Sequence, residues 1–82
     1  MNAISLSVIV SRVDGTLYTG DAVSVSVPSI EGEMVVLAHH EPLIALLGKG
    51  VVRVRLTVSH VKEFNIESGL IEISNNHATI LV

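Results

Sequence analysis

Short runs of alternating apolar and polar residues dominate this chain and restrict it to β-structure. Apolar side chains occupy every second position in three runs, residues 4–10, 23–27 and 52–56, with mostly serines or arginines between them. A two-residue period gives a strand with one buried face, whereas an amphipathic helix repeats its apolar residues every three to four positions. The sequence contains no ten-residue amphipathic helix pattern with capping residues. We therefore expect about eight to ten short strands in an all-β sandwich or small barrel.

Turn-forming residues separate these runs. The pairs Asp14-Gly15 and Gly20-Asp21 predict two early turns, because glycine adopts a positive φ without steric cost. The run Gly48-Lys49-Gly50 is the clearest hairpin signal. The run Asn75-Asn76-His77 predicts a last hairpin, since asparagine tolerates left-handed backbone geometry.

The middle of the chain has a less regular pattern. Residues 33–37 predict a strand, and the apolar run Met34–Leu37 predicts that this strand is buried on both faces. Residues 43–47 are also apolar, and they fit either a short strand or a helical turn. Five residues are too few for periodicity to decide between the two.

Length and composition limit the architecture. The chain of 82 residues is expected to form a single domain, residues 1–82. Apolar residues make up 49% of it, but it has one Tyr, one Phe and no Trp, so Val, Ile and Leu must build the core. Branched side chains of this kind favour strands. The absence of cysteine excludes disulfides and thiolate metal sites.

Charge and hydropathy exclude several classes of partner. A net charge of −3 and the scarcity of aromatic side chains argue against nucleic-acid binding. No apolar run approaches the roughly 18 residues of a membrane helix, and the first residues lack the basic region of a signal peptide. We therefore expect a cytosolic chain that does not insert into a membrane.

The titratable side chains do not form a catalytic pattern. The candidates are four histidines and three central glutamates: His39, His40, His60, His77, Glu31, Glu33 and Glu41. The adjacent histidines would point to opposite faces of a strand and could converge only in a loop. No nucleophile stands beside a base, and no glycine-rich phosphate loop is present. We expect no catalytic residue, no metal site and no cofactor.

Two loops and two surface patterns remain as candidates for binding. If the loops at residues 31–33 and 38–43 emerge at one end of the sandwich, they form its working end. Arg53 and Arg55 share one strand face, which is either solvated or paired with carboxylates on a neighbouring strand. The serine-rich faces of the first two runs are ordinary outward positions or, alternatively, docking faces, because interface cores are depleted of charge. Their serines are Ser5, Ser7, Ser24 and Ser26.

The motifs, taken together, resemble a known family. The run Glu-Gly-Glu-Met-Val-Val-Leu-Ala-His-His-Glu-Pro-Leu (31–43), followed by Gly-Lys-Gly-Val-Val-Arg-Val (48–54), closely resembles the epsilon subunit of F-type ATP synthases. That family typically reads Glu-Gly-Glu-Leu-Gly-Val-Leu-Pro-Gly-His-Ala-Pro-Leu-Leu, then a Lys-Pro-Gly turn and Val-Arg-Val. Residues 68–73 and 76–81 resemble its Gly-Gly-Phe-Leu-Glu-Val and Asn-x-Val-Thr-Ile-Leu segments. The resemblance covers essentially the whole chain and rests on the order and spacing of these motifs.

The resemblance implies a fold and a function. The fold would be a flattened β-sandwich of about ten short, mostly antiparallel strands. The function would be that of a non-catalytic central-stalk (rotor) subunit, which binds the gamma subunit and the c-ring and couples ion-driven rotation to ATP synthesis. Such a subunit lies peripherally on the cytoplasmic face of the bacterial inner membrane.

The resemblance also assigns roles by position. Glu31, Gly32 and Glu33 match the turn that faces the c-ring. His40, Pro42 and Leu43 match the neighbouring loop, which faces the gamma subunit and the ring. The glutamates would then pair with basic residues of the c-ring loops, each pair contributing about 0–1 kcal/mol.

The chain departs from the family pattern at several positions. Val35, Ala38 and His39 stand where Gly, Pro and Gly are usual, and the loss of glycine at position 39 predicts a different loop backbone. Family members usually continue into two C-terminal helices that serve inhibition and, in some, ATP binding. The sequence ends at Val82, so we expect either a natural short form or an isolated domain, in both cases without the helical arm and without that ATP site.

The alternative interpretation is a free-standing β-sandwich module that binds a protein or a ligand. The spacing of the Glu-Gly-Glu and His-x-Pro-Leu motifs favours the stalk subunit. In either case, long apolar strands with an uncovered edge would allow the isolated chain to form a homo-oligomer.

Overall fold

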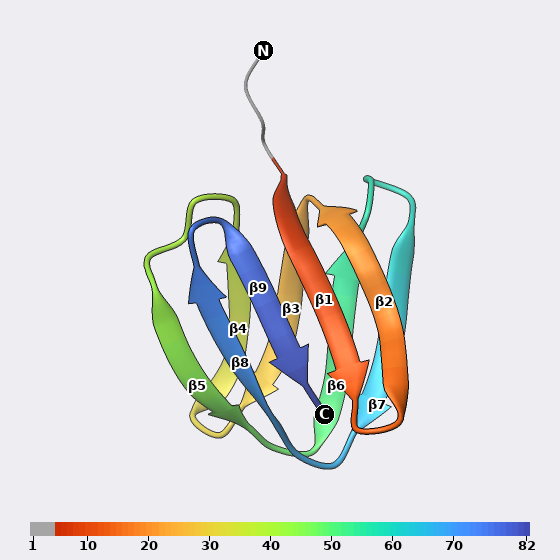
Figure 1. The fold of residues 1–82 in the computed structure, drawn as a ribbon, viewed down its shortest axis with the longest axis vertical. Helices are drawn as coiled ribbons and strands as arrows, with labels where there is room; N and C mark the ends of the chain where they lie inside the picture. The colour runs from red at the N-terminus through yellow and green to blue at the C-terminus, as the bar shows by residue number, and fades with distance from the viewer. Residues whose placement is uncertain (1–4) are drawn as a thin grey trace.

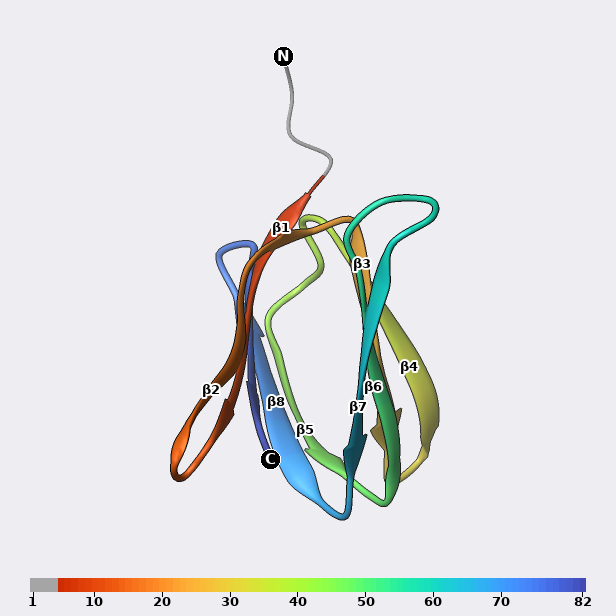
Figure 2. The same ribbon diagram turned by 90° about the vertical axis from the view of Figure 1, so that its right-hand side faces the viewer.

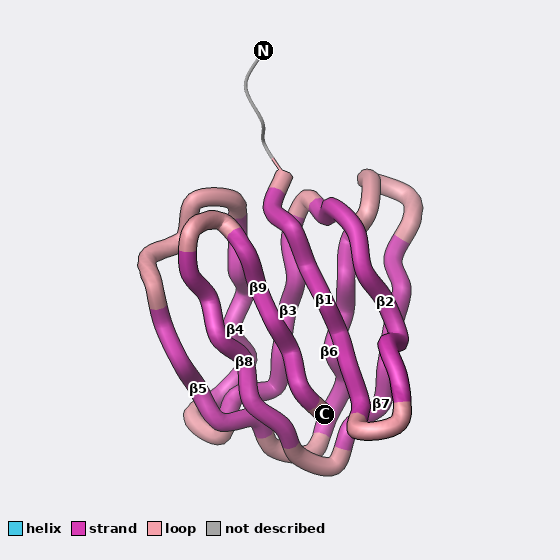
Figure 3. Tube along the Cα trace, in the orientation of Figure 1, coloured by secondary structure: helices cyan, strands magenta, loops and turns pink. Residues whose placement is uncertain are grey.

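The computed structural model describes residues 5–82, and every regular element in this range is a strand (Figures 1 and 3). The strands are β1 (Leu6–Arg12), β2 (Gly15–Ala22), β3 (Ser24–Ser29), β4 (Gly32–Leu37), β5 (Leu43–Leu47), β6 (Gly50–Arg55), β7 (Val61–Ile66), β8 (Gly69–Ser74) and β9 (His77–Leu81). These nine strands confirm the all-β prediction and resolve residues 43–47 as a strand.

The strands pack in two layers (Figure 2). The front layer of Figure 1 has the order β2-β1-β9-β8-β5, and the back layer has the order β4-β3-β6-β7. The pair of Ser29 with Leu47 links β3 to β5, and the sheet folds over at this point. Within residues 5–82 every pairing is antiparallel except the parallel one between β1 and β9. The expected flattened, mostly antiparallel sandwich is confirmed.

The core follows the alternation in the sequence. On β1, Leu6, Val8 and Val10 are at most 1% exposed, while Ser7 and Ile9 point outward. Ile4, which begins this alternation in the sequence, lies outside the described residues. The largest fully buried side chains are all aliphatic: Leu6, Ile71, Ile73, Ile80, Val8, Val10, Val25, Val27, Val36, Val52 and Val54. Full burial of one such side chain stabilises the fold by about 1.5–3 kcal/mol.

The prediction for β4 is wrong in one respect. This strand is buried on one face, because Val36 is buried while Val35 and Leu37 are more than half exposed. β4 pairs along its length with β3 and ends the back layer on that side. An apolar run is therefore only half-buried here, since β4 packs on the front layer with one face and nothing in the described chain covers the other.

The prediction of a hairpin at Gly48-Lys49-Gly50 is also wrong. β5 pairs with β8 in the front layer, and β6 pairs with β3 and β7 in the back layer, so this segment crosses between layers. Gly50 passes so close to β3 that an added Cβ would lie 2.7 Å from the Cβ of Pro28. The glycine is required for this close approach rather than for a tight turn.

The expected turn at Gly20-Asp21 is absent, and both residues lie inside β2. The side chain of Tyr18 folds over Gly20, where an added Cβ would lie 2.9 Å from the tyrosine Oη. That hydroxyl donates a hydrogen bond to the backbone oxygen of Asp21 at 2.8 Å. The glycine thus makes room for an aromatic side chain along its own strand.

The last predicted hairpin is confirmed. β8 and β9 pair from Leu70–Leu81 to Ser74–His77, and Asn75 and Asn76 form the connecting turn. Their φ angles are 48° and 62°, in the left-handed region that asparagine tolerates.

Candidate binding surfaces

The two candidate loops lie at opposite ends of the sandwich. The β3–β4 turn is at the lower end in Figure 1, and the loop of residues 38–42 is at the upper end. The six residues of β4 separate them, a length of about 20 Å at 3.3–3.4 Å per residue. The prediction of one working end formed by both loops is therefore wrong, because a strand carries the chain from one end to the other.

The acidic turn is tighter than its sequence suggests. Ile30 and Glu31 occupy the turn itself, and Gly32 and Glu33 already belong to β4. The hydroxyl of Ser29 donates to the backbone oxygen of Gly32 at 2.6 Å and accepts from the backbone N–H of Glu31 at 3.2 Å. Gly32 has a φ of 126°, which a side chain would disfavour. The side chain of Glu31 is thus presented at the tip of a fixed turn.

The loop of residues 38–42 is tied to the far end of the sandwich. The backbone N–H of His39 donates to Oδ1 of Asn76 at 2.7 Å, and Nδ2 of Asn76 donates to the backbone oxygen of Ser5 at 3.0 Å. His39 has a φ of 64°, so it adopts the left-handed conformation that glycine favours. A histidine at this position is thus compatible with a left-handed backbone, and the expected difference from the family's loop stays a prediction.

The three predicted residues of this loop have different environments. His40 is partly buried, and its Nδ1 hydrogen-bonds with the backbone oxygen of Glu41 at 2.7 Å. Pro42 is exposed. Leu43 packs against the core rather than facing outward. Pro42 is therefore the predicted residue in this loop that a partner reaches most directly.

An apolar surface on the front layer was missed by the sequence analysis. The register places Leu46 opposite Leu70, and Leu70 opposite Leu81, on the outward positions of three neighbouring strands. We call these three side chains the leucine row. Leu46 is 57% exposed, Leu81 is 48% exposed, and the adjacent Ile44 is exposed as well. The apolar residues between the core positions of β5 were the available signal, but the pairing of β5 with β8 was not visible in the sequence.

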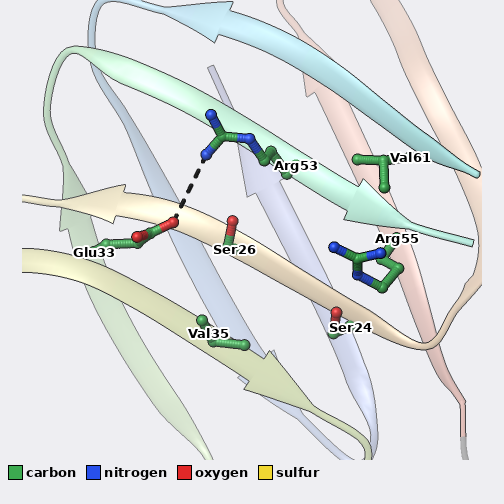
Figure 4. Close-up of a pocket in the computed structure, with 7 residues that line it drawn as sticks. All are labelled: Ser24, Ser26, Glu33, Val35, Arg53, Arg55 and Val61. Carbon is green, nitrogen blue, oxygen red and sulfur yellow. Dashed lines mark ion pairs between the residues drawn. The ribbon is translucent and has the colours of Figure 1, made fainter. Parts of the chain in front are cut away.

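The outer face of the back layer carries the two arginines (Figure 4). Arg53 forms ion pairs with Glu63 at 2.9 Å and with Glu33 at 3.7 Å. Glu63 on the neighbouring strand β7 confirms the paired interpretation for Arg53, and Glu33 reaches it from β4 across β3. Glu33 is thereby engaged within the domain, whereas Glu31 forms no ion pair among residues 5–82.

The titratable groups remain scattered. No group of three or more His, Asp or Glu side chains within residues 5–82 is arranged to hold a metal ion. His60 and His77 are exposed; His60 lies in the β6–β7 connection, and His77 begins β9. Across the same residues, no helix is long and apolar enough to cross a membrane.

Fold and surfaces together define a small β-sandwich whose exposed features suit contact with other proteins. The leucine row and the arginine-bearing face lie on opposite layers, and the acidic turn borders both of them: Glu31 lines a hollow with Leu46, and Glu33 lines another with Arg53. Outward apolar side chains that adjoin one another, rather than single scattered ones, mark interaction surfaces.

Comparison with protein families identifies the sandwich. Residues 5–82 match the family described as the β-sandwich domain of the ATP synthase delta/epsilon chain. The chain belongs to this family, and the resemblance inferred from its motifs is confirmed. The prediction of an epsilon-subunit type of domain is confirmed at this level.

Curated relatives carry the corresponding name. The chain is 35% identical over 68 residues to the ATP synthase epsilon chain of Wolbachia pipientis wMel, an alignment that covers 83% of this chain and 60% of that protein. It is 38% identical over 81 residues to the ATP synthase epsilon chain of Leptospira borgpetersenii, which covers 99% of this chain and 63% of that protein. The chain thus spans about three fifths of the length of these relatives.

Solved structures share the fold. A chain in the Euglena gracilis mitochondrial ATP synthase, in a structure of OSCP, F1 and c-ring, superposes with a TM-score of 0.90 at 20% identity, covering 100% of this chain and 52% of that one. A chain in the Tetrahymena thermophila mitochondrial ATP synthase central stalk and c-ring gives a TM-score of 0.76 at 17% identity, covering 93% and 61%. At these identities the comparison establishes the β-sandwich.

Proposed function

We propose that this chain forms one domain and acts as a non-catalytic central-stalk subunit of an F-type ATP synthase. In this role it binds the gamma subunit and the c-ring and couples ion-driven rotation to ATP synthesis on other chains. The observation that carries the proposal is the family match over residues 5–82. The curated relatives named as epsilon chains are bacterial, which supports a peripheral position on the cytoplasmic face of the bacterial inner membrane.

The leucine row is the part of the surface best suited to the gamma subunit. Its side chains adjoin one another across β5, β8 and β9, so a partner can cover them together. Burial of apolar area yields about 25 cal/mol per Å², whereas exposed ion pairs contribute little. Pro42 immediately precedes β5, the strand that carries Leu46, so β5 connects the predicted gamma-facing loop to this row.

The acidic turn is the proposed contact with the c-ring. Glu31 is exposed, stands at the tip of a turn fixed by Ser29, and forms no ion pair within the described part of the chain. Gly32 and Glu33, the first residues of β4, follow Glu31 directly and complete the proposed c-ring contact. Because Arg53 already pairs with Glu33, Glu31 is the carboxylate most available to basic c-ring residues.

Co-expression with the gamma subunit of the same genome, followed by size-exclusion chromatography, tests the proposal. We expect a stoichiometric complex that Leu46→Asp weakens by at least about tenfold, since loss of a central apolar contact costs more than about 1.4 kcal/mol. Pro42→Asp is expected to weaken it as well.

Val35→Asp is the matched control. Val35 is 56% exposed, nearly the same as Leu46 at 57%, but it lies on the back layer. We expect it to leave the complex intact. A chain that stays free of gamma, alone or as a homo-oligomer, would contradict the stalk role and support the free-standing module.

A further inference from the structure

Register leaves Arg55 without a carboxylate partner on the back layer. Arg53 lies opposite Glu63 on β7, whereas Arg55 lies opposite Val61 on the same strand. On its other side Arg55 lies opposite Ser24 of β3. No Asp or Glu oxygen within residues 5–82 comes within 4.0 Å of its guanidinium. Among the described residues the guanidinium makes one long hydrogen bond of 3.4 Å, donated from Nη1 to the backbone oxygen of Val58.

Apolar side chains flank this arginine on both sides. Leu37 of β4 lies opposite Ser24. Cross-strand partners therefore form one row over the four strands of the back layer: Leu37, Ser24, Arg55, Val61. Leu37 is 58% exposed and Val61 is 37% exposed. The next row of partners has a carboxylate at one end. It consists of Val35, Ser26, Arg53 and Glu63. Only the row of Arg55 combines an unpaired guanidinium with apolar neighbours at both ends.

Two serine hydroxyls add hydrogen-bond donors beside the arginines. Ser24 and Ser26 line a surface hollow together with Arg53 and Arg55, and Figure 4 shows both serine side chains on the same face as the guanidinium groups. Neither hydroxyl forms a hydrogen bond among the described residues. A guanidinium fork and a neighbouring hydroxyl are donors that a carboxylate accepts readily.

We propose that the row Leu37–Ser24–Arg55–Val61 is a docking surface for a partner-protein segment that presents one carboxylate between apolar side chains. Charge complementarity selects the carboxylate, because Arg55 is the unpaired cation on this face. The exposed Leu37 and Val61 favour apolar side chains on either side of that carboxylate. Arginines within apolar surroundings are typical anchors of protein interfaces. This surface lies on the layer opposite the leucine row, so its partner is additional to the gamma contact proposed above.

Titration of the chain with small carboxylates tests this proposal, with binding followed by the NMR chemical shifts of the backbone amides and of the arginine Nε–Hε groups. The probe is 4-methylpentanoate, a carboxylate with a branched apolar tail, and the comparison probes are acetate and inorganic phosphate. We expect saturable shifts at Ser24, Arg55 and Val61 with a Kd of about 10 mM for 4-methylpentanoate. Acetate and phosphate are expected to bind at least about fivefold more weakly, because they lack the apolar part.

Variants and alternative outcomes make the test decisive. Arg55→Gln is expected to abolish the saturable shifts, and Arg12→Gln, which removes the same charge from the exposed end of β1, to preserve them. Equal binding of phosphate and 4-methylpentanoate would overturn the proposal in favour of a general anion site. Absence of saturation up to about 100 mM would overturn it outright. If the chemical shifts of these residues change with protein concentration in the absence of any probe, the surface binds a second copy of the chain, and the proposal of a partner segment is overturned.

Discussion

Gly69 illustrates how a single residue can be fixed by packing rather than by a turn. It begins β8, and an added Cβ would lie 2.5 Å from the backbone oxygen of Leu81 and 3.2 Å from a side-chain carbon of Val82. A backbone atom at this distance has no free rotation by which to move aside. The sequence analysis did not single out this close approach, because it arises between strands that are neighbours only in the folded chain.

We expect Gly69→Ala to lower the free energy of unfolding by about 1–3 kcal/mol, because the added methyl displaces β9. Gly48→Ala is the control, since its nearest neighbour to an added Cβ is a side-chain carbon of Ile30 at 3.9 Å. That variant is expected to be neutral or stabilising by up to about 1 kcal/mol. Urea unfolding followed by circular dichroism measures both, and equal effects would contradict the contact.

Tyr18 gives the molecule an alkaline pH dependence. Burial, and secondarily the charge of Asp21, raise the pKa of Tyr18 above its ordinary value of about 10. The folded chain therefore holds the phenol proton more tightly than the unfolded chain. Its contribution to stability is complete below about pH 10 and is lost as pH rises through the folded-state pKa.

We expect Tyr18→Phe to cost about 1 kcal/mol of stability at neutral pH, through loss of the hydrogen bond to the backbone of Asp21. The stability difference between the two proteins should narrow above about pH 10, where only the tyrosine form loses stability through this group. Urea unfolding at a series of pH values measures the difference. A constant difference across the alkaline range would show that Tyr18 titrates alike in both states.

At the scale of the element, β4 shows the effect of an uncovered outer face. The run Met34–Leu37 reads as a fully buried strand, but its outward residues meet solvent because no further layer covers the outer face of the back layer. Hydropathy reports what a side chain prefers and not whether a neighbour is present to cover it. This is also why the apolar residues of β5 form part of an exposed row.

Adjacent valines on β4 allow the one-sided burial to be measured. We expect Val36→Ala to lower the free energy of unfolding by about 1–3 kcal/mol, because Val36 is 0% exposed and its loss leaves a cavity. Val35→Ala removes the same atoms from an exposed position and is expected to cost less than about 0.5 kcal/mol. Similar losses for the two variants in urea unfolding would restore the prediction of burial on both faces.

At the scale of the whole molecule, the separation of the two candidate loops divides the proposed contacts. The turn carrying Glu31 and the loop carrying Pro42 lie at opposite ends of β4, so one flat surface cannot face both. On the proposed function, Glu31 serves the c-ring and Pro42 serves the gamma subunit.

We expect Glu31→Lys to weaken binding to isolated c-ring by up to about 1 kcal/mol and to weaken the gamma complex less, because Glu31 borders the leucine row without belonging to it. Pro42→Asp is expected to do the reverse, and the double variant should show additive losses because the sites are well separated. Affinities measured by biolayer interferometry with immobilised c-ring and gamma test this. Loss of both partners in either single variant would contradict the division of contacts.

The sequence by itself determined the strand content, the aliphatic core and the last hairpin. These properties are local: a two-residue alternation sets which face of a strand is buried, and Asn75 and Asn76 adopt their left-handed geometry within the turn itself. The motif order further determined the family, which the comparisons confirmed. The paired state of Arg53 was one of two alternatives that the alternation left open.

Only the tertiary structure decided which strands are neighbours. Backbone hydrogen bonds between strands are nearly the same for any pair, so the sequence of one strand does not identify its partner. Gly48-Lys49-Gly50 therefore resembles a hairpin but crosses between layers, and the two candidate loops separate to opposite ends. The same pairing assembles the leucine row and leaves Arg55 without a carboxylate, because a surface made from several strands exists only once their register is set.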